Sequence, residues 1–300
     1  MTEPGDEDAE LEASRAPLLA HLTELRTRLV ICVAALAVGF VVCFAFAEPI
    51  YLFLLHPFEI AANLFAAQKA GGAHGGPFDL LLALAGLRDV PRAGAEDLQF
   101  VFTAPLEFFF TKLKLAGFGA LMLTFPIIAW QLYRFVAPGL YRRERKAFLP
   151  FLLAAPLLFA LGAALVYFIM LPFVLWFSLS QQIVGAGNIS VQLLPKVSDY
   201  LSLVTTLLLA FGLCFQLPVV VALMGLAGIV SSKALAAGRR YAIVGVVVVA
   251  AVVTPPDPIS QLMLAVPLVL LYEVSIWCVR LIELRRRREE LAEMRSSAVP

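Results

Sequence analysis

Long apolar stretches separated by short polar ones dominate the pattern of this chain. A helix that crosses a bilayer needs about 20 mostly apolar residues, and six stretches approach or exceed that length. We therefore predict six transmembrane helices, at residues 29–47, 115–133, 148–178, 200–229, 241–253 and 259–282. The third stretch is long enough to tilt or to protrude from the bilayer, whereas the fifth is short for a span.

Prolines decide how the last apolar stretches divide. Pro255, Pro256 and Pro258 stand between the fifth and sixth stretches, and prolines so close together favour a turn over a kink in one continuous helix. We therefore predict that the last two helices are short and form a tight hairpin, which suggests a locally thinned bilayer. Prolines inside the second, third, fourth and sixth stretches predict kinked helices with a concave face. These are Pro126, Pro156, Pro172, Pro218 and Pro267.

Composition supports an integral membrane protein. The chain is 61% hydrophobic and 15% charged, with a mean hydropathy of +0.89, whereas soluble domains are about 45–50% apolar and about 25% charged. A soluble fold would have to expose much of this apolar surface. The four cysteines fall inside apolar segments without CxxC spacing, so we interpret them as packing residues and not as disulfide partners or metal ligands.

Charge is segregated along the chain, although the net charge is only +1. Residues 1–16 form an acidic tail that we expect to be disordered, and residues 283–300 form a charged tail that we expect to be frayed. Between them, residues 17–282 form the six-span membrane domain. The acidic start lacks the basic segment of a cleavable signal peptide, so we expect the first apolar stretch to be retained.

The distribution of Lys and Arg predicts the orientation. The two tails and the second and fourth connections carry 17 of these residues, and the remaining connections carry six. The positive-inside rule therefore places both termini in the cytoplasm and three loops outside. The first outer connection, 48–111, is long and contains a Gly-rich linker at 71–77 and an apolar segment at 78–87 that we expect to form a short surface helix.

Two carboxylates lie among bases on the predicted cytoplasmic side. Glu24 precedes Arg26 and Arg28 just before the first span, and Glu144 lies inside the basic segment 141–146. The ordinary interpretation of each is a counter-charge at the membrane surface. The functional interpretation is an anionic site that receives a guanidinium, because bidentate geometry makes Arg the natural ligand of a carboxylate. The residues alone leave both interpretations open.

Two polar side chains fall inside predicted spans. Gln216 stands near Pro218 in the fourth span, where an amide commonly makes a helix–helix hydrogen bond, and structural and docking roles are both open for it. Glu273 is the only carboxylate well inside a span. An intramembrane acid indicates a functional site unless it is a neutral, hydrogen-bonded packing group.

Several classes of function lack their signatures. The sequence has no GxSxG, HExxH or GxxxxGK[ST] motif, and its three histidines lie outside the predicted spans. We therefore expect no catalytic residues, no metal site and no cofactor. An intramembrane protease would also need a His or Lys base inside a span. We interpret the Arg run at 285–288 as a topology determinant and not as a nucleic-acid patch.

One alternative from the residues is a proton-coupled secondary transporter of small molecules. Glu273 would be its proton relay, and the concave face would form the substrate cavity. The chain shows no internal repeat, which counts against the inverted-repeat class of transporters.

Four polar motifs together resemble the TatC family, whose members are the core membrane component of the twin-arginine protein translocase. They are HLTELRTRL at 21–29, FVAPGLYRRER at 135–145, FGLCFQLP at 211–218 and TPPDPISQ at 254–261. The resemblance covers about residues 17–282. It implies an all-α polytopic fold of six transmembrane helices in a concave, glove-shaped bundle with the last two helices short. It also implies a receptor in the bacterial cytoplasmic (inner) membrane, and not an enzyme.

The resemblance assigns roles to individual residues. Glu24 and Glu144, with Arg26 beside the first, would bind the paired guanidiniums of a twin-arginine signal peptide. Many family members carry Glu where this chain has Gln216, and Gln cannot ionise, so a proton-dependent step at this position does not transfer to this chain. The resemblance also implies that partner subunits dock in the membrane at Gln216, Glu273, Thr254, Ser260 and Gln261. It implies structural roles at the outer face for Pro105, Glu107 and Asp257.

The expected partners also follow from the resemblance. They are TatA-like and TatB-like single-span subunits, twin-arginine signal peptides of folded cargo proteins, and membrane lipid. We expect a hetero-oligomer with several TatC-like copies, in which the proton-motive force drives export. Neither nucleic acid nor a cofactor is implied.

Overall fold

The structure is a computed structural model that describes residues 4–69, 82, 87, 100–101, 104–136, 144–181, 183–186, 189–191, 196–253 and 258–297 of the 300-residue chain. Within these ranges, only the backbone is described for residues 4–21, 64, 66–69, 133, 136, 144–152, 183–186, 189–191, 258–260, 289–290, 292–293 and 295–297. Most of the surface helix predicted at 78–87 therefore lies outside the described residues.

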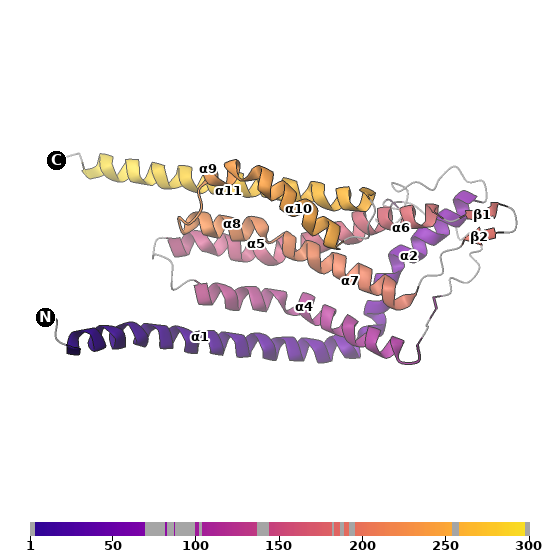
Figure 1. The fold of residues 1–300 in the computed structure, drawn as a ribbon, viewed down its shortest axis with the longest axis horizontal. Helices are drawn as coiled ribbons and strands as arrows, with labels where there is room; N and C mark the ends of the chain where they lie inside the picture. Colours follow the sequence, from indigo (N-terminus) through magenta and orange to yellow (C-terminus); the bar gives the residue numbers. More distant parts are fainter. Residues whose placement is uncertain are drawn as a thin grey trace.

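The helices lie side by side along the long axis of the molecule, and both chain termini project from the same end (Figure 1). Along one side, α1 (Pro4–Ala45) packs against α4 (Glu107–Val136). The middle of the bundle contains α5 (Glu144–Leu165), the π-helical turn η2 (Val166–Met170), α6 (Leu171–Ser180), α7 (Val197–Cys214) and α8 (Leu217–Leu226). The other side consists of α9 (Ser232–Ala237), α10 (Arg239–Val253) and α11 (Pro258–Ser297). We call the end that carries both termini the termini end.

The opposite end, which we call the hairpin end, carries one further helix and a small sheet (Figure 1). There α2 (Ala47–Lys69) packs against α6. The strands β1 (Ile183–Ala186) and β2 (Ile189–Val191) form an antiparallel pair, with Ile183 opposite Val191. The all-α expectation holds apart from this short pair of strands.

Five segments of the described chain are helical, long and apolar enough to cross a membrane. They are Leu22–Ala45, Glu107–Leu132, Leu153–Ser180, Val197–Leu226 and Gln261–Arg288, and they match predicted spans one to four and six. The predicted fifth span is α10, which has 15 residues and is short, as expected. Since α10 ends at Val253 and α11 begins at Pro258, the break predicted at the prolines is confirmed.

Both ends of the chain are more helical than we predicted. We expected the acidic segment 1–16 to be disordered, but α1 is helical from Pro4 onward. We also expected a short last helix and a frayed tail at 283–300, but α11 has 40 residues and continues to Ser297. The physical reason is composition, since the first segment is rich in Glu and Ala and the second in Arg and Glu, all residues of high intrinsic helix propensity.

The helix α2 was not predicted, because Pro57 and polar neighbours interrupt its apolar run. Pro57 has no backbone N–H, so the carbonyl of Phe53, four residues earlier, lacks its usual helical partner. The Tyr167 hydroxyl donates a hydrogen bond to this carbonyl oxygen at 2.9 Å. Similarly, the Tyr200 hydroxyl donates to the carbonyl oxygen of Leu54 at 2.9 Å. Two phenols from the middle of the bundle therefore anchor the irregular part of α2.

Prolines also mark the two breaks in the central spans. Pro172 lies at the start of α6, directly after the π-helical turn η2. Pro218 lies at the start of α8, where the helical run of α7 is interrupted at Phe215 and Gln216. Each proline removes one helical hydrogen bond and forces a local change in direction. The regular α-helical pattern is therefore interrupted at both prolines, as expected where a helix kinks.

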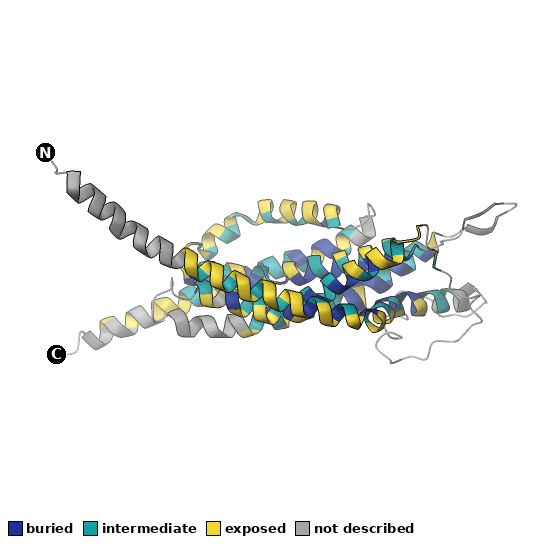
Figure 2. Cartoon of the chain, turned by 90° about the horizontal axis from the view of Figure 1, so that it is seen from below, coloured by how far each residue is buried: buried dark blue, intermediate teal, exposed yellow. Residues whose placement is uncertain are grey.

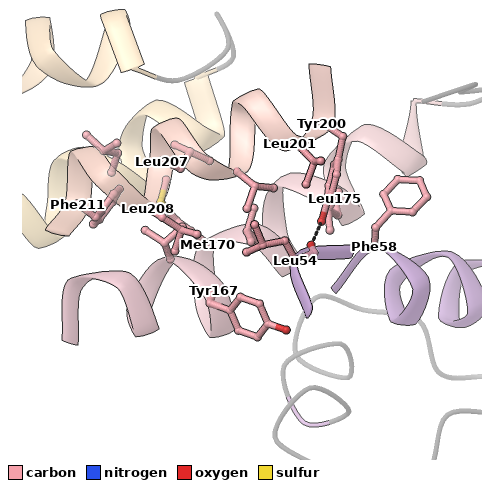
Figure 3. Packing of buried hydrophobic residues seen from close by; sticks show 14 of the residues in the cluster. Leu54, Phe58, Tyr167, Met170, Leu175, Tyr200, Leu201, Leu207, Leu208 and Phe211 are labelled. Atoms are coloured by element: carbon pink, nitrogen blue, oxygen red, sulfur yellow. Dashed lines mark hydrogen bonds between the residues drawn. The ribbon is translucent and has the colours of Figure 1, made fainter. Parts of the chain in front are cut away.

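The core lies between α2, η2, α6 and α7. Leu54 and Phe58 of α2 meet Tyr200 and Leu201 of α7, while Met170 of η2 is almost fully buried below them (Figure 3). The central helices α5 and α7 approach closely through glycines. A Cβ atom at Gly162 would lie 2.9 Å from the backbone oxygen of Phe211, and one at Gly212 would lie 2.6 Å from the Phe159 ring. Small residues at such crossings are typical of membrane helix packing.

Exposed apolar side chains cover the outside of the bundle. Figure 2 shows exposed residues along α1 and buried residues concentrated in the centre of the molecule. Among the described residues, Leu29, Val33, Val38 and Val41 of α1 are all largely exposed. A row of exposed aliphatic side chains on a helix of this length is expected where lipid tails surround the protein.

Candidate functional site

The carboxylate of Glu24 lies between α1 and α4, near the termini end of the membrane span. Glu24 belongs to the first turn of the span Leu22–Ala45, and α4 brings Gln131 to the same level near the end of the span Glu107–Leu132. The two helices run in opposite directions (Figure 1). The side chain of Glu24 is 32% exposed, so solvent or a ligand can reach it.

Arg28 connects Glu24 to α4. Its Nη2 donates to Glu24 Oε1 at 3.1 Å, and its Nη1 donates to Gln131 Oε1 at 3.3 Å. Because Glu24 and Arg28 are four residues apart, they face the same side of α1. Gln131 is buried, so the contact crosses the interface between the two helices. The chain of three side chains fixes where the Glu24 carboxylate lies.

The other residues predicted for peptide binding belong to α1 and to the start of α5. Arg26 is exposed on α1. Glu144 is the first residue of α5, which starts at the termini end (Figure 1), and its side chain lies outside the described residues. The structure therefore brings the backbones of both predicted carboxylates to the same end of the bundle.

Gln216 lies at the break between α7 and α8 and is used within the bundle. Its Nε2 donates to the backbone oxygen of Ala155 on α5 at 2.9 Å. This contact ties the broken span to its neighbour, which is the structural role that remained open from the sequence. The side chain is only partly buried, so its amide is also within reach of another helix.

Glu273 of α11 forms an ion pair that was not predicted. Arg239 of α10 donates through Nε to Glu273 Oε1 at 2.7 Å and through Nη2 to Oε2 at 2.9 Å. This is bidentate geometry, in which two charge-assisted hydrogen bonds join the same two side chains. The neighbouring Tyr272 donates its hydroxyl to the backbone oxygen of Leu235 at 2.8 Å. Together these contacts hold α11 to α9 and to the start of α10.

The remaining predicted docking residues lie near the hairpin between α10 and α11. Gln261 donates through Nε2 to the backbone oxygen of Val247 at 3.4 Å, a long hydrogen bond between the two helices. The side chain of Ser260, and the whole of Thr254 and Asp257, lie outside the described residues.

At the hairpin end, Glu107 and Pro105 form the start of α4. Glu107 Oε2 accepts a hydrogen bond from the backbone N–H of Ala104 at 3.2 Å, which resembles the acid in a capping box. Its Oε1 accepts from Ser198 Oγ at 2.5 Å and lies 3.5 Å from Lys196 Nζ. The Glu107 side chain is only 8% exposed. Pro105 is exposed in the preceding turn, so both residues occupy structural positions.

Four partners in these clusters were missed from the sequence. Gln131 is a polar residue near the end of a predicted span. A polar side chain within a span was the signal that selected Gln216, and the same signal could have selected Gln131. Arg239 was counted only as a loop charge, and Lys196 and Ser198 had no local signal that connects them to Glu107. Their pairings join segments that are distant in sequence, which spacing arguments cannot find.

Comparisons with known proteins agree on one family. The family model described as Sec-independent protein translocase protein (TatC) matches residues 20–267. The chain is similar to the Sec-independent protein translocase protein TatC of Magnetococcus marinus, with 40% identity over 93% of this chain and 89% of that protein. It is also similar to TatC of Escherichia coli, with 32% identity over 91% of this chain and 92% of that protein.

A solved structure gives the same result. The crystal structure of the twin-arginine translocase receptor TatC superimposes with a TM-score of 0.65 and 31% sequence identity, and the match covers 87% of this chain and 98% of that chain.

Proposed function

Because this chain belongs to the TatC family of Sec-independent protein translocase proteins, we propose that its termini end is the surface that binds twin-arginine signal peptides. The chain is the receptor component of the twin-arginine translocase and a multi-pass membrane protein. The proposal concerns which residues bind the signal peptide and where the other subunits dock. It describes a binding protein and not an enzyme.

The main support for the proposal is the environment of Glu24, which combines one fixed contact with partial exposure. Its carboxylate is held in position by Arg28 at 3.1 Å, yet the side chain remains about one-third exposed. A carboxylate can accept about four hydrogen bonds, so one contact with Arg28 leaves capacity for a second guanidinium. Glu24 is therefore oriented for an incoming Arg and is not already saturated by the protein.

Two such carboxylates explain the preference for paired Arg. In the proposal, Glu24 binds one guanidinium of the signal and Glu144, at the start of α5, binds the other. Arg presents a planar fork that matches a carboxylate, whereas Lys presents a point charge, so replacing Arg by Lys loses geometry as well as hydrogen bonds. The nearby bases, including Arg26, disfavour a single cation, which would face more repulsion than attraction.

Orientation and location follow from the charge distribution. The excess of Lys and Arg on the segments that meet at the termini end supports its placement in the cytoplasm. For a family member of this kind, the membrane is the bacterial cytoplasmic membrane. Signal peptides emerging with folded cargo would then meet Glu24 on the side where proteins are made.

The membrane part of the bundle is proposed to dock single-span TatA-like and TatB-like subunits. Gln216 and Glu273, with Thr254, Ser260 and Gln261 around the last hairpin, are the polar groups available for this. Gln216 and Glu273 already contact Ala155 and Arg239, so a partner would share these groups. Several copies of the chain would assemble with these subunits and lipid, and the proton-motive force would drive export.

The alternative of a small-molecule transporter loses support at Glu273. In the structure this carboxylate forms a bidentate ion pair with Arg239 at 2.7 and 2.9 Å. The pair joins α10 to α11, which is a helix-packing role and does not require a substrate cavity.

Peptide binding tests the proposal directly. The purified full-length protein in detergent is titrated with a labelled Arg-Arg signal peptide and with its Lys-Lys counterpart. We expect the Arg-Arg peptide to bind more tightly. Glu24→Gln and Glu144→Gln should each weaken it by about ten- to a hundredfold, since a charge-assisted contact contributes about 1.5–3 kcal/mol.

The matched control is Glu59→Gln. Glu59 is an exposed carboxylate of α2, so this variant removes the same charge away from the termini end. It should bind both peptides as the wild type does. Equal binding of the two peptides by the wild type, or loss of binding in the Glu59 variant alone, would contradict the proposal.

A further inference from the structure

The hydrogen bonds of Arg28 divide between two helices. Its Nη2 contacts Glu24 on its own helix, and its Nη1 contacts Gln131 on α4. The third donor group, Nε, is buried and has no hydrogen-bond partner among the described residues. A guanidinium can donate from Nε as well as from both Nη atoms. Since Nε makes no hydrogen bond within the described part of the chain, the two Nη hydrogen bonds determine where the Arg28 side chain lies.

Gln131 is well suited to hold Arg28 without competing with Glu24. It is 8% exposed and lies in the interface between α1 and α4. Its neutral amide oxygen binds Nη1 but carries no charge, so it does not draw Arg28 away from the carboxylate. An acid at this position would bind the guanidinium more strongly. The Arg28 guanidinium therefore has two acceptors of different strength. The stronger one, the Glu24 carboxylate, is partly exposed, and the weaker one, the Gln131 amide, is buried.

We infer that Arg28 and Gln131 are positioning residues for Glu24, the carboxylate proposed to bind the signal peptide. In this inference, which rests on the proposed function, neither residue contacts the peptide. Gln131 fixes Arg28, and Arg28 fixes the partly exposed Glu24 side chain through one carboxylate oxygen, which leaves the other oxygen for a ligand. Without the anchor, the Glu24 side chain would sample several rotamers, and each peptide-binding event would have to restrict it again.

The arrangement also affects the choice between Arg and Lys. Arg28 neutralises part of the Glu24 charge. The attraction of the site for any further cation is therefore reduced. Recognition then depends on the geometry of hydrogen bonds to a fixed carboxylate, in which a planar guanidinium has the advantage over an ammonium. Releasing the carboxylate should reduce this advantage.

The test is a double-mutant cycle between Glu24 and Gln131, measured by peptide binding to the full-length protein. Gln131→Met keeps the length of the side chain and removes the acceptor. We expect this variant to bind the Arg-Arg peptide about three- to tenfold more weakly than the wild type does. The difference in affinity between the Arg-Arg and Lys-Lys peptides should also become smaller. In the Glu24→Gln background the same change should have an effect of less than about twofold, because residues that act through one another are not additive.

Arg28→Lys provides a second variant with unchanged charge. A lysine cannot reach both acceptors with a fixed fork, so we expect the same weakening and the same dependence on Glu24. The control is Thr124→Val in the same helix interface. Thr124 is buried and donates only to the backbone oxygen of Ala120 in its own helix, so the loss of its hydroxyl should leave peptide affinity unchanged.

The outcomes separate this inference from the proposed function. If Glu24→Gln itself leaves binding unchanged, the proposed function fails. If Glu24→Gln weakens binding but Gln131→Met and Arg28→Lys do not, or if they weaken it equally in both backgrounds, the proposed function stands and the positioning role is wrong.

Discussion

Glu24 at the termini end and Glu107 at the hairpin end are the same chemical group in opposite situations. Glu107 is 8% exposed and accepts hydrogen bonds from Ser198 and from the backbone of Ala104, with Lys196 beside it. Glu24 is 32% exposed and is held by one Arg. The first carboxylate is enclosed by groups from two segments of the chain. The second is oriented from one side only.

The difference indicates which of the two can serve a ligand. A buried carboxylate that already has several donors stabilises the fold, and any new ligand would have to replace these contacts. A partly exposed carboxylate with one fixed contact has been oriented without being saturated. A carboxylate at each end of one bundle is therefore not evidence for two binding sites. We expect substitutions at Glu107 to change stability and substitutions at Glu24 to change binding.

The largest effect on stability is expected for Glu107→Ala. The change leaves the partly buried Ser198 hydroxyl and Lys196 ammonium, and the exposed Ala104 N–H, without their acceptor. Leaving such groups unpaired should lower the free energy of unfolding by about 2–4 kcal/mol. The measurement is thermal or denaturant unfolding of the purified protein in detergent.

Glu24→Gln is the matched comparison for this prediction. An i,i+4 ion pair at a partly exposed position contributes about 0.3–0.5 kcal/mol, so its unfolding curve should stay close to that of the wild type. Folded Glu107→Ala protein should in turn bind the Arg-Arg peptide with wild-type affinity. A Glu107 variant that folds normally but loses peptide binding would overturn the division between the two ends.

Tyr200→Phe tests the second anchor of the hairpin end. The buried Tyr200 hydroxyl donates to the backbone oxygen of Leu54 in the irregular part of α2. Its removal leaves that carbonyl without this donor and should lower stability by about 1–1.5 kcal/mol, with no change in peptide binding. Tyr167→Phe, which frees the oxygen of Phe53, should have a similar effect. If neither variant changes the unfolding midpoint, the two phenols do not anchor α2.

The sequence predicted those parts of the molecule that depend on local pattern. The spans follow from runs of apolar residues, the hairpin before α11 follows from its prolines, and the pairing of Glu24 with Arg28 is readable from their spacing. By contrast, α2 was missed because His56, Pro57 and Glu59 interrupt its apolar run. Its stability comes from a buried face that includes Leu54, Phe58 and Ala61, which only the packed structure reveals.

The partners of the polar residues were less predictable than the residues themselves. Glu273 was selected from its place in a span, but Arg239 lies 34 positions away, at the start of another helix. Gln131 and Arg28 are separated by 103 positions. Such pairs depend on which helices pack together and at what height. A single sequence contains no direct signal for either.

A smaller effect than at the hairpin end is expected for the pair Arg239 and Glu273, whose contacts are intermediate between those of Glu107 and Glu24. The geometry is bidentate, but the two side chains are 49% and 36% exposed. A double-mutant cycle with Arg239→Gln and Glu273→Gln should therefore give a coupling of about 0.5–1 kcal/mol in unfolding, and it should decrease at high salt. A coupling near 3 kcal/mol would place Glu273 with Glu107 among the structural carboxylates, and its proposed role in docking partner subunits would lose its basis. A small coupling leaves the carboxylate free to exchange Arg239 for a partner's donor at little cost in stability, which is what a docking residue requires.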